Sequence, residues 1–388
     1  MIDRHPFARR LADIEPFHVM AILARARALE AQGRSIIHME IGEPDFPAAE
    51  GIVEAGVAAL RAGHTHYTPA LGLPALREAI AANYAPACGV DAARVVVTPG
   101  ASGALQLVFA ALLSPGDRVL LADPGYPCNR HFVRLFEGAA TGVPVDADTS
   151  YQLTADLIRR HWTPDTVAVL LASPSNPTGT LVPPAELARI VETVHELGGV
   201  LIVDEIYHGL TYGVEAVSAL RYSSDVFVVN SFSKYYGMTG WRLGWIVAPP
   251  AYLPALEKLA QNIFLAASTP AQHAALAAFT PAVQRELERR RDIFRERRDY
   301  LLPALRALGF AIPLVPPGAF YLYADCSRFT DDSERFAREL LEQAGVAITP
   351  GLDFGRHRAR QHVRFSYATT RANLEEGVRR LAEFLRRR

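Results

Sequence analysis

The chain has 388 residues with 40 basic and 41 acidic side chains, a formal net charge of −1, and half of its residues are hydrophobic. This balance argues against a nucleic-acid-binding protein and predicts a globular chain of one or two domains. The three cysteines lack CxxC spacing, which argues against a disulfide scaffold or a zinc ribbon. The chain shows neither a signal-peptide core nor an apolar run of membrane-spanning length, so we expect a soluble cytoplasmic protein.

The hydropathy pattern predicts an α/β fold. An amphipathic helix is expected over residues 16–32, and six short apolar strands follow, with helices between several of them, clearest at 101–113 and 184–197. Apolar strands that alternate with helices are typical of a mainly parallel sheet covered by helices on both faces. The expected strands cover residues 94–100, 118–124, 167–175, 199–205, 225–231 and 243–249.

The pattern changes near residue 280. A long charged helix over about 281–307 is followed by the segment GAFYLYADC, a helix at 331–344, a strand at 362–368 and a final helix. This order predicts a smaller α+β domain packed on the sheet domain. The predicted organisation is an N-terminal segment (1–45) that joins the small domain, a large domain (46–280) and a small C-terminal domain (281–388).

Lysine is rare in this chain. It occurs only at Lys234 and Lys258, and every other residue in the combined count of lysine and arginine is an arginine. A lysine amine can be made neutral and nucleophilic, whereas a guanidinium stays protonated. Lys258 lies in a surface-helix pattern. Lys234 lies in SFSKYYGMTGWRLGW, which has no helical face, and is therefore the candidate for amine chemistry.

The residues around Lys234 fit pyridoxal 5'-phosphate. This cofactor needs a lysine for a Schiff base, an acid at the pyridinium nitrogen, a donor at the ring oxygen and a phosphate cradle. Asp204 ends an apolar strand, where a carboxylate is costly unless paired, and is the predicted acid. Tyr207, three residues later, is the predicted donor to the ring oxygen. An acid solvated at a strand end is the alternative reading of Asp204.

Two segments predict the phosphate cradle. One brings two serine hydroxyls and an arginine to the loop around Lys234, which suits a phosphate dianion. The other is the start of the helix at 101–113, where free backbone N–H groups and the helix dipole attract anions. Each segment alone also fits an ordinary polar loop or helix cap. The predicted phosphate-binding residues are Gly100, Ala101, Ser102, Ser231, Ser233 and Arg242.

Three further residues are candidates for binding the cofactor or the substrate. Asn176 follows a strand end and is predicted to reach the ring oxygen or a substrate carboxylate, although SNPTG also fits a simple turn. Tyr126 in DPGYP is predicted to stack on the pyridine ring, unless it is a core tyrosine. Arg364 lies within an apolar strand and is predicted to clamp a substrate α-carboxylate, with a structural salt bridge as the alternative. A metal site is not expected, because the pair of histidines in HTH lacks a third ligand.

Taken together, these motifs resemble the class I/II (fold type I) pyridoxal-phosphate aminotransferases. The short N-terminus and two of the segments resemble the subgroup that contains prokaryotic aspartate and aromatic aminotransferases. The likeness extends over nearly the whole chain. The segments that carry it are GEPDF (42–46), YTPALGLPALREAI (67–80), SNPTG (175–179), DEIY (204–207), SFSKYYGMTGWRLGW (231–245), GAFYLY (318–323) and RFSYA (364–368).

The resemblance implies a homodimer with active sites at the subunit interface. Tyr67 of one subunit would reach the phosphate bound by the other, and the Gly42 backbone would lie against the substrate carboxylate. The Asn176–Pro177 bond is expected to be cis. One position departs from part of the family, because Ser102 stands where some prokaryotic aspartate enzymes have a lysine that grips a second carboxylate. The preferred amino donor therefore stays open.

The implied activity is ping-pong transamination from an L-amino acid to a 2-oxo acid, with 2-oxoglutarate as the expected acceptor. Lys234 would be both the Schiff-base residue and the carrier of the Cα proton. Two alternatives remain: a β-C–S lyase or other eliminase on the same fold, and a non-catalytic ligand-binding protein. The expected partners are small molecules and a second copy of the chain, with neither nucleic acid nor membrane.

Overall fold

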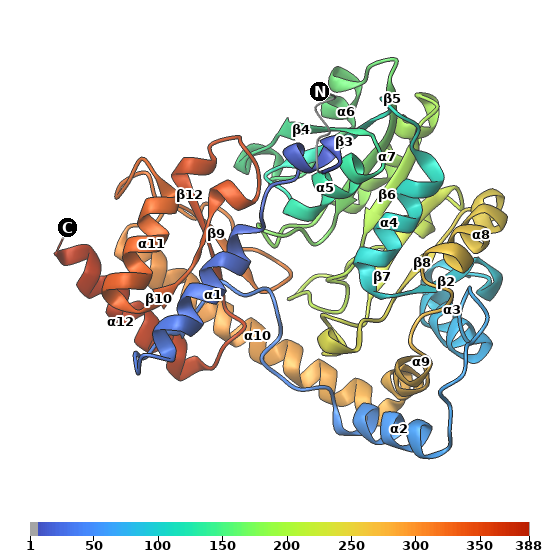
Figure 1. The fold of residues 1–388 in the computed structure, drawn as a ribbon. Coiled ribbons are helices and arrows are strands. Elements are labelled where there is room, and N and C mark those ends of the chain that lie inside the picture. The colour runs from blue at the N-terminus through green and yellow to red at the C-terminus, as the bar shows by residue number, and fades with distance from the viewer. Residues whose placement is uncertain (1–6, 388) are drawn as a thin grey trace, which may run out of the picture.

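A seven-stranded sheet forms the centre of the computed structural model, which describes residues 7–387 (Figure 1). The strand order is β2-β8-β7-β6-β5-β3-β4, and β8 alone runs antiparallel to its two neighbours. The predicted mainly parallel α/β sheet is thus confirmed. The strands are β2 (Val95–Thr98), β3 (Arg118–Asp123), β4 (Ala139–Pro144), β5 (Thr166–Ala172), β6 (Val200–Asp204), β7 (Val226–Ser231) and β8 (Gly244–Val247).

The six apolar segments predicted as strands all form strands of this sheet. The edge strand β4 was not predicted, because its sequence AATGVP has neither an apolar run nor a clear alternation. It forms through its backbone ladder with β3. The reversed direction of β8 was also not predicted, since an apolar run carries no information on strand direction.

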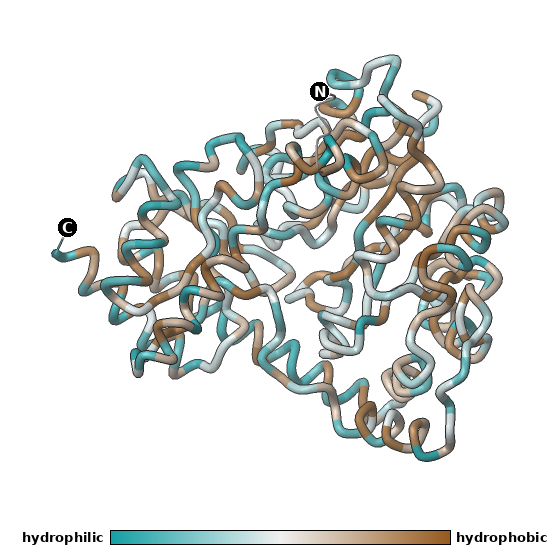
Figure 2. Tube along the Cα trace, viewed as in Figure 1, coloured by the Kyte–Doolittle hydropathy of each residue, from teal (hydrophilic) through white to brown (hydrophobic). Residues whose placement is uncertain are grey.

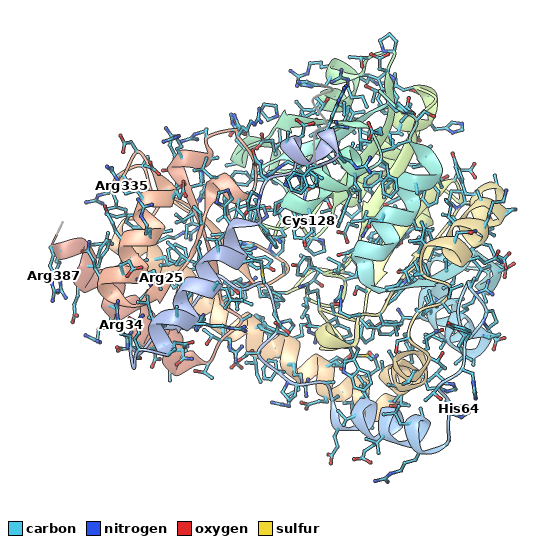
Figure 3. The ribbon with its side chains drawn as sticks, in the orientation of Figure 1. Arg25, Arg34, His64, Cys128, Arg335 and Arg387 are labelled. Atoms are coloured by element: carbon cyan, nitrogen blue, oxygen red, sulfur yellow. The ribbon has the colours of Figure 1, made fainter. Side chains whose placement is uncertain are left out.

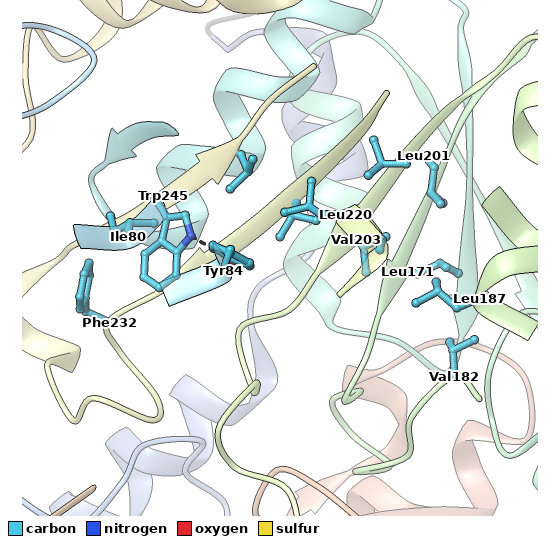
Figure 4. Close-up of a cluster of buried hydrophobic side chains, with 14 of the residues drawn as sticks. Ile80, Tyr84, Leu171, Val182, Leu187, Leu201, Val203, Leu220, Phe232 and Trp245 are labelled. Atoms are coloured by element: carbon cyan, nitrogen blue, oxygen red, sulfur yellow. Dashed lines mark hydrogen bonds between the residues drawn. The ribbon is translucent and has the colours of Figure 1, made fainter. Parts of the chain in front are cut away.

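Helices cover both faces of the sheet, and the strands between them are largely hydrophobic (Figure 2). On one face, Phe109 and Phe227 belong to a fully buried cluster beneath α4 (Gly100–Leu112), α5 (Pro127–Leu135) and α8 (Leu253–Ile263). On the other face, Trp245 donates a 3.2 Å hydrogen bond from Nε1 to the Tyr84 hydroxyl within the second cluster (Figure 4). The helices of that face are α2 (Glu50–Arg61), α3 (Pro74–Cys88), α6 (Ala155–His161), α7 (Pro184–Glu196) and α9 (Thr269–Leu276).

A second, smaller sheet lies in the C-terminal part of the chain. Its strands β11 (Thr349–Pro350), β12 (His362–Ser366) and β9 (Tyr321–Asp325) are antiparallel in that order. A separate hydrophobic cluster packs this sheet against nearby helices. The helices are α10 (Pro281–Leu308), α11 (Ser333–Ala344) and α12 (Arg371–Arg386), close to the predicted positions.

The N-terminal segment packs on this C-terminal part. Strand β1 (Ile37–His38) pairs in parallel with β10 (Val346–Ala347), and α1 (His18–Glu30) lies beside them (Figure 1). Arg25 Nε lies 2.6 Å from the Glu342 carboxylate on α11, and Arg34 donates to the Glu342 carbonyl at 2.7 Å (Figure 3). From α1 onward the N-terminal segment therefore packs on the C-terminal part of the chain, whereas Arg10 and Asp13, ahead of α1, form ion pairs with Glu137 and Arg134 at α5.

Helix α10 contributes to both halves of the structure. Its Val283 and Leu287 belong to the cluster of the central sheet, whereas Phe294 and Leu301 belong to the cluster of the small sheet. Because one helix serves both, the boundary at residue 280 stays a prediction, as does the one at residue 45. Within residues 7–387, no helix combines the length and the apolar character needed to cross a membrane.

Candidate active site

The predicted site residues follow strands that end at one edge of the central sheet. Strands β2, β3, β5, β6 and β7 run in the same direction. The residues just after them therefore lie at a common edge, the usual place for a ligand in an open α/β sheet. From β2 to β7, the first predicted site residue at each strand end is Gly100, Tyr126, Asn176, Asp204 and Ser231, and Lys234 follows three residues after Ser231.

The Lys234 amine is held near the GEPDF turn. Its Nζ donates a 2.5 Å hydrogen bond to the Gly42 carbonyl, and the residue is half-buried. Burial, helped by the nearby cations Arg364 and Arg242, lowers the pKa of Lys234 from 10.5 to about 8, although the charge of Glu43 opposes the shift. A substantial fraction of this amine is therefore neutral near physiological pH, as nucleophilic chemistry requires.

Asp204 is a buried carboxylate at the end of β6, with 6% of its surface exposed. Its Oδ1 accepts a 3.0 Å hydrogen bond from the Ile206 backbone. Burial raises the pKa of Asp204 to about 6, although the Ile206 bond and the charge of Lys234 oppose this. A carboxylate in this state would gain from a cationic partner such as a pyridinium nitrogen.

Tyr207 makes a contact that the sequence did not indicate. Its hydroxyl lies 2.8 Å from the Tyr321 hydroxyl, and both rings are buried. Tyr321 also fills the space in front of Gly42, where a Cβ atom would collide with the tyrosine hydroxyl. Only glycine fits at position 42 without a rearrangement, so the GEPDF turn can approach this side chain closely.

Arg364 is buried, and none of the described residues is an acidic partner for it. It is 3% exposed, and Nη1 donates to Asn176 Oδ1 at 2.8 Å, while Nη2 donates to the Glu40 carbonyl. The guanidinium carbon lies 4.2 Å from the centre of the Tyr321 ring. No carboxylate within residues 7–387 forms an ion pair with Arg364, and its Nε has no hydrogen-bond partner there. The structural salt bridge considered as an alternative is therefore not present within this range.

The two segments predicted to bind phosphate come together. Ser231 Oγ lies 2.9 Å from Ser233 Oγ and accepts a 3.0 Å hydrogen bond from the Ser233 backbone. A Cβ atom at Gly100, which has a φ of +73°, would lie 2.7 Å from Arg242 Nη2. The guanidinium of Arg242 thus sits against the first turn of α4, where the N–H groups of Gly100, Ala101 and Ser102 have no partner within the helix.

The donor set fits pyridoxal phosphate. A cradle of hydroxyls, helix N–H groups and Arg242 matches a phosphate, and a buried carboxylate and a lysine of lowered pKa match the ring nitrogen and the aldehyde carbon. Tyr126 stands at the start of α5 and lines a cavity of about 1150 Å³ together with Ser175 and Phe354. Lys234, Asp204 and Arg364 do not line this cavity, so its volume is not a measure of the cofactor site. The Asn176–Pro177 bond is cis, as the resemblance implied.

Comparison with known proteins identifies the family. The family described as aminotransferase class I and II matches residues 34–381. This chain belongs to that family. Valine–pyruvate aminotransferase of Mycobacterium tuberculosis is 40% identical over 96% of this chain and 97% of its own length. A (5-formylfuran-3-yl)methyl phosphate transaminase of Methanocaldococcus jannaschii is 36% identical over 97% of this chain and 99% of its own.

The fold of this aminotransferase is found in solved relatives. The structure of Thermus thermophilus aspartate aminotransferase with maleate superposes with a TM-score of 0.93 at 36% identity, covering 97% of this chain and 99% of that one. The chain is therefore a fold type I, pyridoxal-phosphate-dependent transaminase.

Some residues of the site were not found from the sequence. Tyr321, Thr349 and Glu40 all contact Tyr207 or Arg364. Tyr321 lies in the GAFYLY segment but was not assigned a role there, and Thr349 and Glu40 lie outside the segments that carry the resemblance. Glu205, next to Asp204, is fully buried and accepts a 2.9 Å hydrogen bond from the Ala219 backbone, and burial raises its pKa to about 8. The only available signal was the acidic pair in DEIY directly after an apolar strand.

Tyr67 of the aminotransferase is placed differently from the other predicted residues. It is 82% exposed in the single chain, on the loop between α2 and α3. The neighbouring His66 carbonyl accepts a 2.6 Å hydrogen bond from the Thr269 hydroxyl at the start of α9, which ties the loop to the helix layer. The predicted role of Tyr67 requires a second subunit.

Proposed function

We propose that this aminotransferase transfers the amino group of an L-amino acid to a 2-oxo acid, with 2-oxoglutarate as the acceptor, in a ping-pong sequence. One observation carries the proposal. Arg364 is a buried guanidinium that has hydrogen-bond acceptors but no acidic partner within the described range, and its charge acts on Lys234. An α-carboxylate would supply the missing anion in the same site as the reactive amine.

Each residue around the cofactor has a separate role in the proposed reaction. Pyridoxal phosphate, when bound, supplies the electron sink that makes the Cα proton of an amino acid acidic. Lys234 holds the cofactor and then, as a neutral amine, removes and returns the proton at Cα. Asp204 holds a proton on the ring nitrogen, and Tyr207 and Asn176 orient the ring through its oxygen. Tyr126 stacks on the ring.

The remaining contacts hold the two ends of the site. Arg364, Asn176 and the Gly42 backbone bind the substrate α-carboxylate. The phosphate is bound by charge-assisted hydrogen bonds. The phosphate ligands are Gly100, Ala101, Ser102, Ser231, Ser233 and Arg242.

We further propose a homodimer in which Tyr67 completes the phosphate site of the partner subunit. A tyrosine with 82% of its surface exposed on an anchored loop supports this arrangement. Mixing inactive Lys234→Ala protein with a Tyr67→Phe variant of reduced activity tests it. In hybrid dimers one site would have both an intact lysine and an intact tyrosine, so the activity per Lys234 should exceed that of the Tyr67→Phe dimer. Unchanged activity in a verified hybrid would contradict the shared site.

The amino donor is to be found by experiment. The purified protein is given pools of L-amino acids without any oxo acid, and its absorption spectrum is recorded. Conversion of the bound cofactor to its pyridoxamine form, with release of one 2-oxo acid per site, is expected for a donor. Adding 2-oxoglutarate should restore the original spectrum. Lys234→Ala protein is the control and should not convert at a comparable rate.

A different product would point to the alternative reaction. An eliminase would release pyruvate and ammonia repeatedly from a donor such as cystathionine, without an oxo-acid acceptor. A spectrum that no amino acid changes, in protein that has bound the cofactor, would contradict transamination.

A further inference from the structure

We propose that His38 and Glu40 are positioning residues that hold Arg364 in place for the substrate α-carboxylate. The inference rests on the role proposed above for Arg364. His38 and Glu40 lie in the N-terminal segment, more than 300 residues before Arg364 in the chain. Neither belongs to the groups that contact the cofactor in the proposed site.

The segment that carries both residues is fixed on two sides. Ile37 donates a 2.8 Å hydrogen bond to the Gly345 carbonyl, and Met39 donates to the Ala347 carbonyl at 3.0 Å. On its other side, the Met39 carbonyl accepts a 2.7 Å hydrogen bond from the Ser366 backbone. The segment therefore bridges β10 and β12, and β12 is the strand that contains Arg364.

Alternate residues of an extended segment point to opposite sides. Ile37 and Met39 belong to the hydrophobic cluster of the small sheet. His38 and Glu40 contact each other, with His38 Nδ1 2.7 Å from Glu40 Oε1. This spacing of two residues brings an imidazole and a carboxylate together with a single hydrogen bond.

The backbone carbonyl and the side-chain carboxylate of Glu40 have different partners. Its backbone carbonyl accepts hydrogen bonds from Arg364 Nη2 and, at 3.0 Å, from the Thr349 hydroxyl. Its carboxylate is fully buried, and Oε2 has no hydrogen-bond partner within the described residues. A buried carboxylate is costly unless a cation pairs with it. His38 supplies that cation to Glu40, so it stabilises the conformation that aims the Glu40 carbonyl at Arg364.

His38 is suited to this task. The hydrogen bond to Glu40, together with the weaker effect of Glu30, raises the pKa of His38 to about 9 against the opposing effect of burial. The Glu30 Oε1 atom lies 3.1 Å from His38 Nε2. His38 is therefore an imidazolium at neutral pH. Because the Glu40 carboxylate is paired with His38, it does not pair with the Arg364 guanidinium. Arg364 can therefore bind the carboxylate of a substrate.

Replacing His38 leaves the buried carboxylate of Glu40 without its cation. The segment must then shift so that the carboxylate reaches water, and the carbonyl moves away from Arg364. His38→Leu is expected to raise the KM for the amino donor by at least tenfold while kcat changes less than threefold. His38→Gln retains an N–H donor and should have a smaller effect.

A second substitution separates positioning from general loss of structure. Glu40→Gln removes the charge but keeps the backbone carbonyl. In the double variant H38L/E40Q, the KM is expected to return to within about threefold of the wild-type value. Arg25→Leu is the matched control, because it removes an exposed ion pair from the same N-terminal segment and should leave KM unchanged.

The outcomes distinguish this inference from the proposed function. An unchanged KM in His38→Leu protein that retains its cofactor spectrum would overturn the inference, as would a double variant no better than the single one. If His38→Leu fails to fold, the comparison of His38→Gln with H38Q/E40Q provides the same test. An unchanged KM in Arg364→Lys protein would instead overturn the role of Arg364 itself.

Discussion

Replacing Lys234 by methionine removes a charge whose burial opposes folding. The pKa of Lys234 is about 8 in the folded protein against its ordinary 10.5. Between these two values the unfolded chain binds more protons than the folded chain, so the free energy of unfolding rises with pH across this window. At pH 7 Lys234 is fully charged in the unfolded chain. Burying that charge on folding lowers the free energy of unfolding.

The size of the effect follows from the same values. Lowering the pKa from 10.5 to about 8 corresponds to a destabilisation of about 3 kcal/mol at pH 7. Solvent screening of the half-buried side chain, and the lost hydrogen bond to the Gly42 carbonyl, worth about 1 kcal/mol, reduce the net gain. We therefore expect cofactor-free Lys234→Met protein to be more stable than cofactor-free wild type by about 2 kcal/mol at pH 7 and by almost nothing at pH 9.5.

Urea unfolding followed by tryptophan fluorescence measures this difference, because urea leaves the ionic strength unchanged. Both proteins are compared at one concentration and at both pH values. Lys258→Met is the matched control, since it replaces the exposed lysine on α8 and should change stability by less than about 0.5 kcal/mol. Lys234→Met protein that is no more stable at pH 7, or equally stabilised at both pH values, would refute the reasoning.

Three further substitutions test individual residues. Asp204→Asn should lower kcat by at least about 100-fold with the cofactor still bound, because a neutral amide cannot hold a proton on the ring nitrogen; kcat within tenfold of wild type would contradict this. Arg364→Lys should raise the KM for the amino donor by about 100-fold without altering the cofactor spectrum, since lysine cannot form the bidentate pair; steady-state kinetics and absorbance measure both. Ser102→Lys should raise kcat/KM for aspartate relative to an apolar donor by about tenfold, because it places a cation in the first turn of α4; an unchanged ratio would show that this turn does not face the side chain of the donor.

The candidate site residues that lie in short local motifs could be predicted from the sequence. Lys234, Asp204 and Arg364 stand at strand ends or within apolar strands. A charged group in such a place lowers the stability of the fold unless it has a partner or a functional role. The apolar runs likewise indicated the strands that bring these residues to one edge. Such signals need only a few neighbouring residues.

Contacts between distant segments were not visible. Tyr207 meets Tyr321 across 114 positions, and Arg364 meets Glu40 across 324. No period or spacing relates such residues, so their pairing becomes evident only in the folded chain, where β9 brings Tyr321 to Tyr207 and the N-terminal segment brings Glu40 to Arg364. Strand β4 escaped prediction for a related reason, because its stability comes from the ladder with β3 rather than from its own side chains.

The shared helix α10 has a consequence for how the chain can vary. Leu287 packs with the central sheet and Phe294 with the small sheet, on a continuous helix that spans Pro281–Leu308. One residue inserted between them would rotate everything beyond it by roughly 100° and advance it by about 1.5 Å. The two apolar contacts could not then be satisfied together. We expect insertions and deletions to be tolerated in surface loops but eliminated by selection within this stretch.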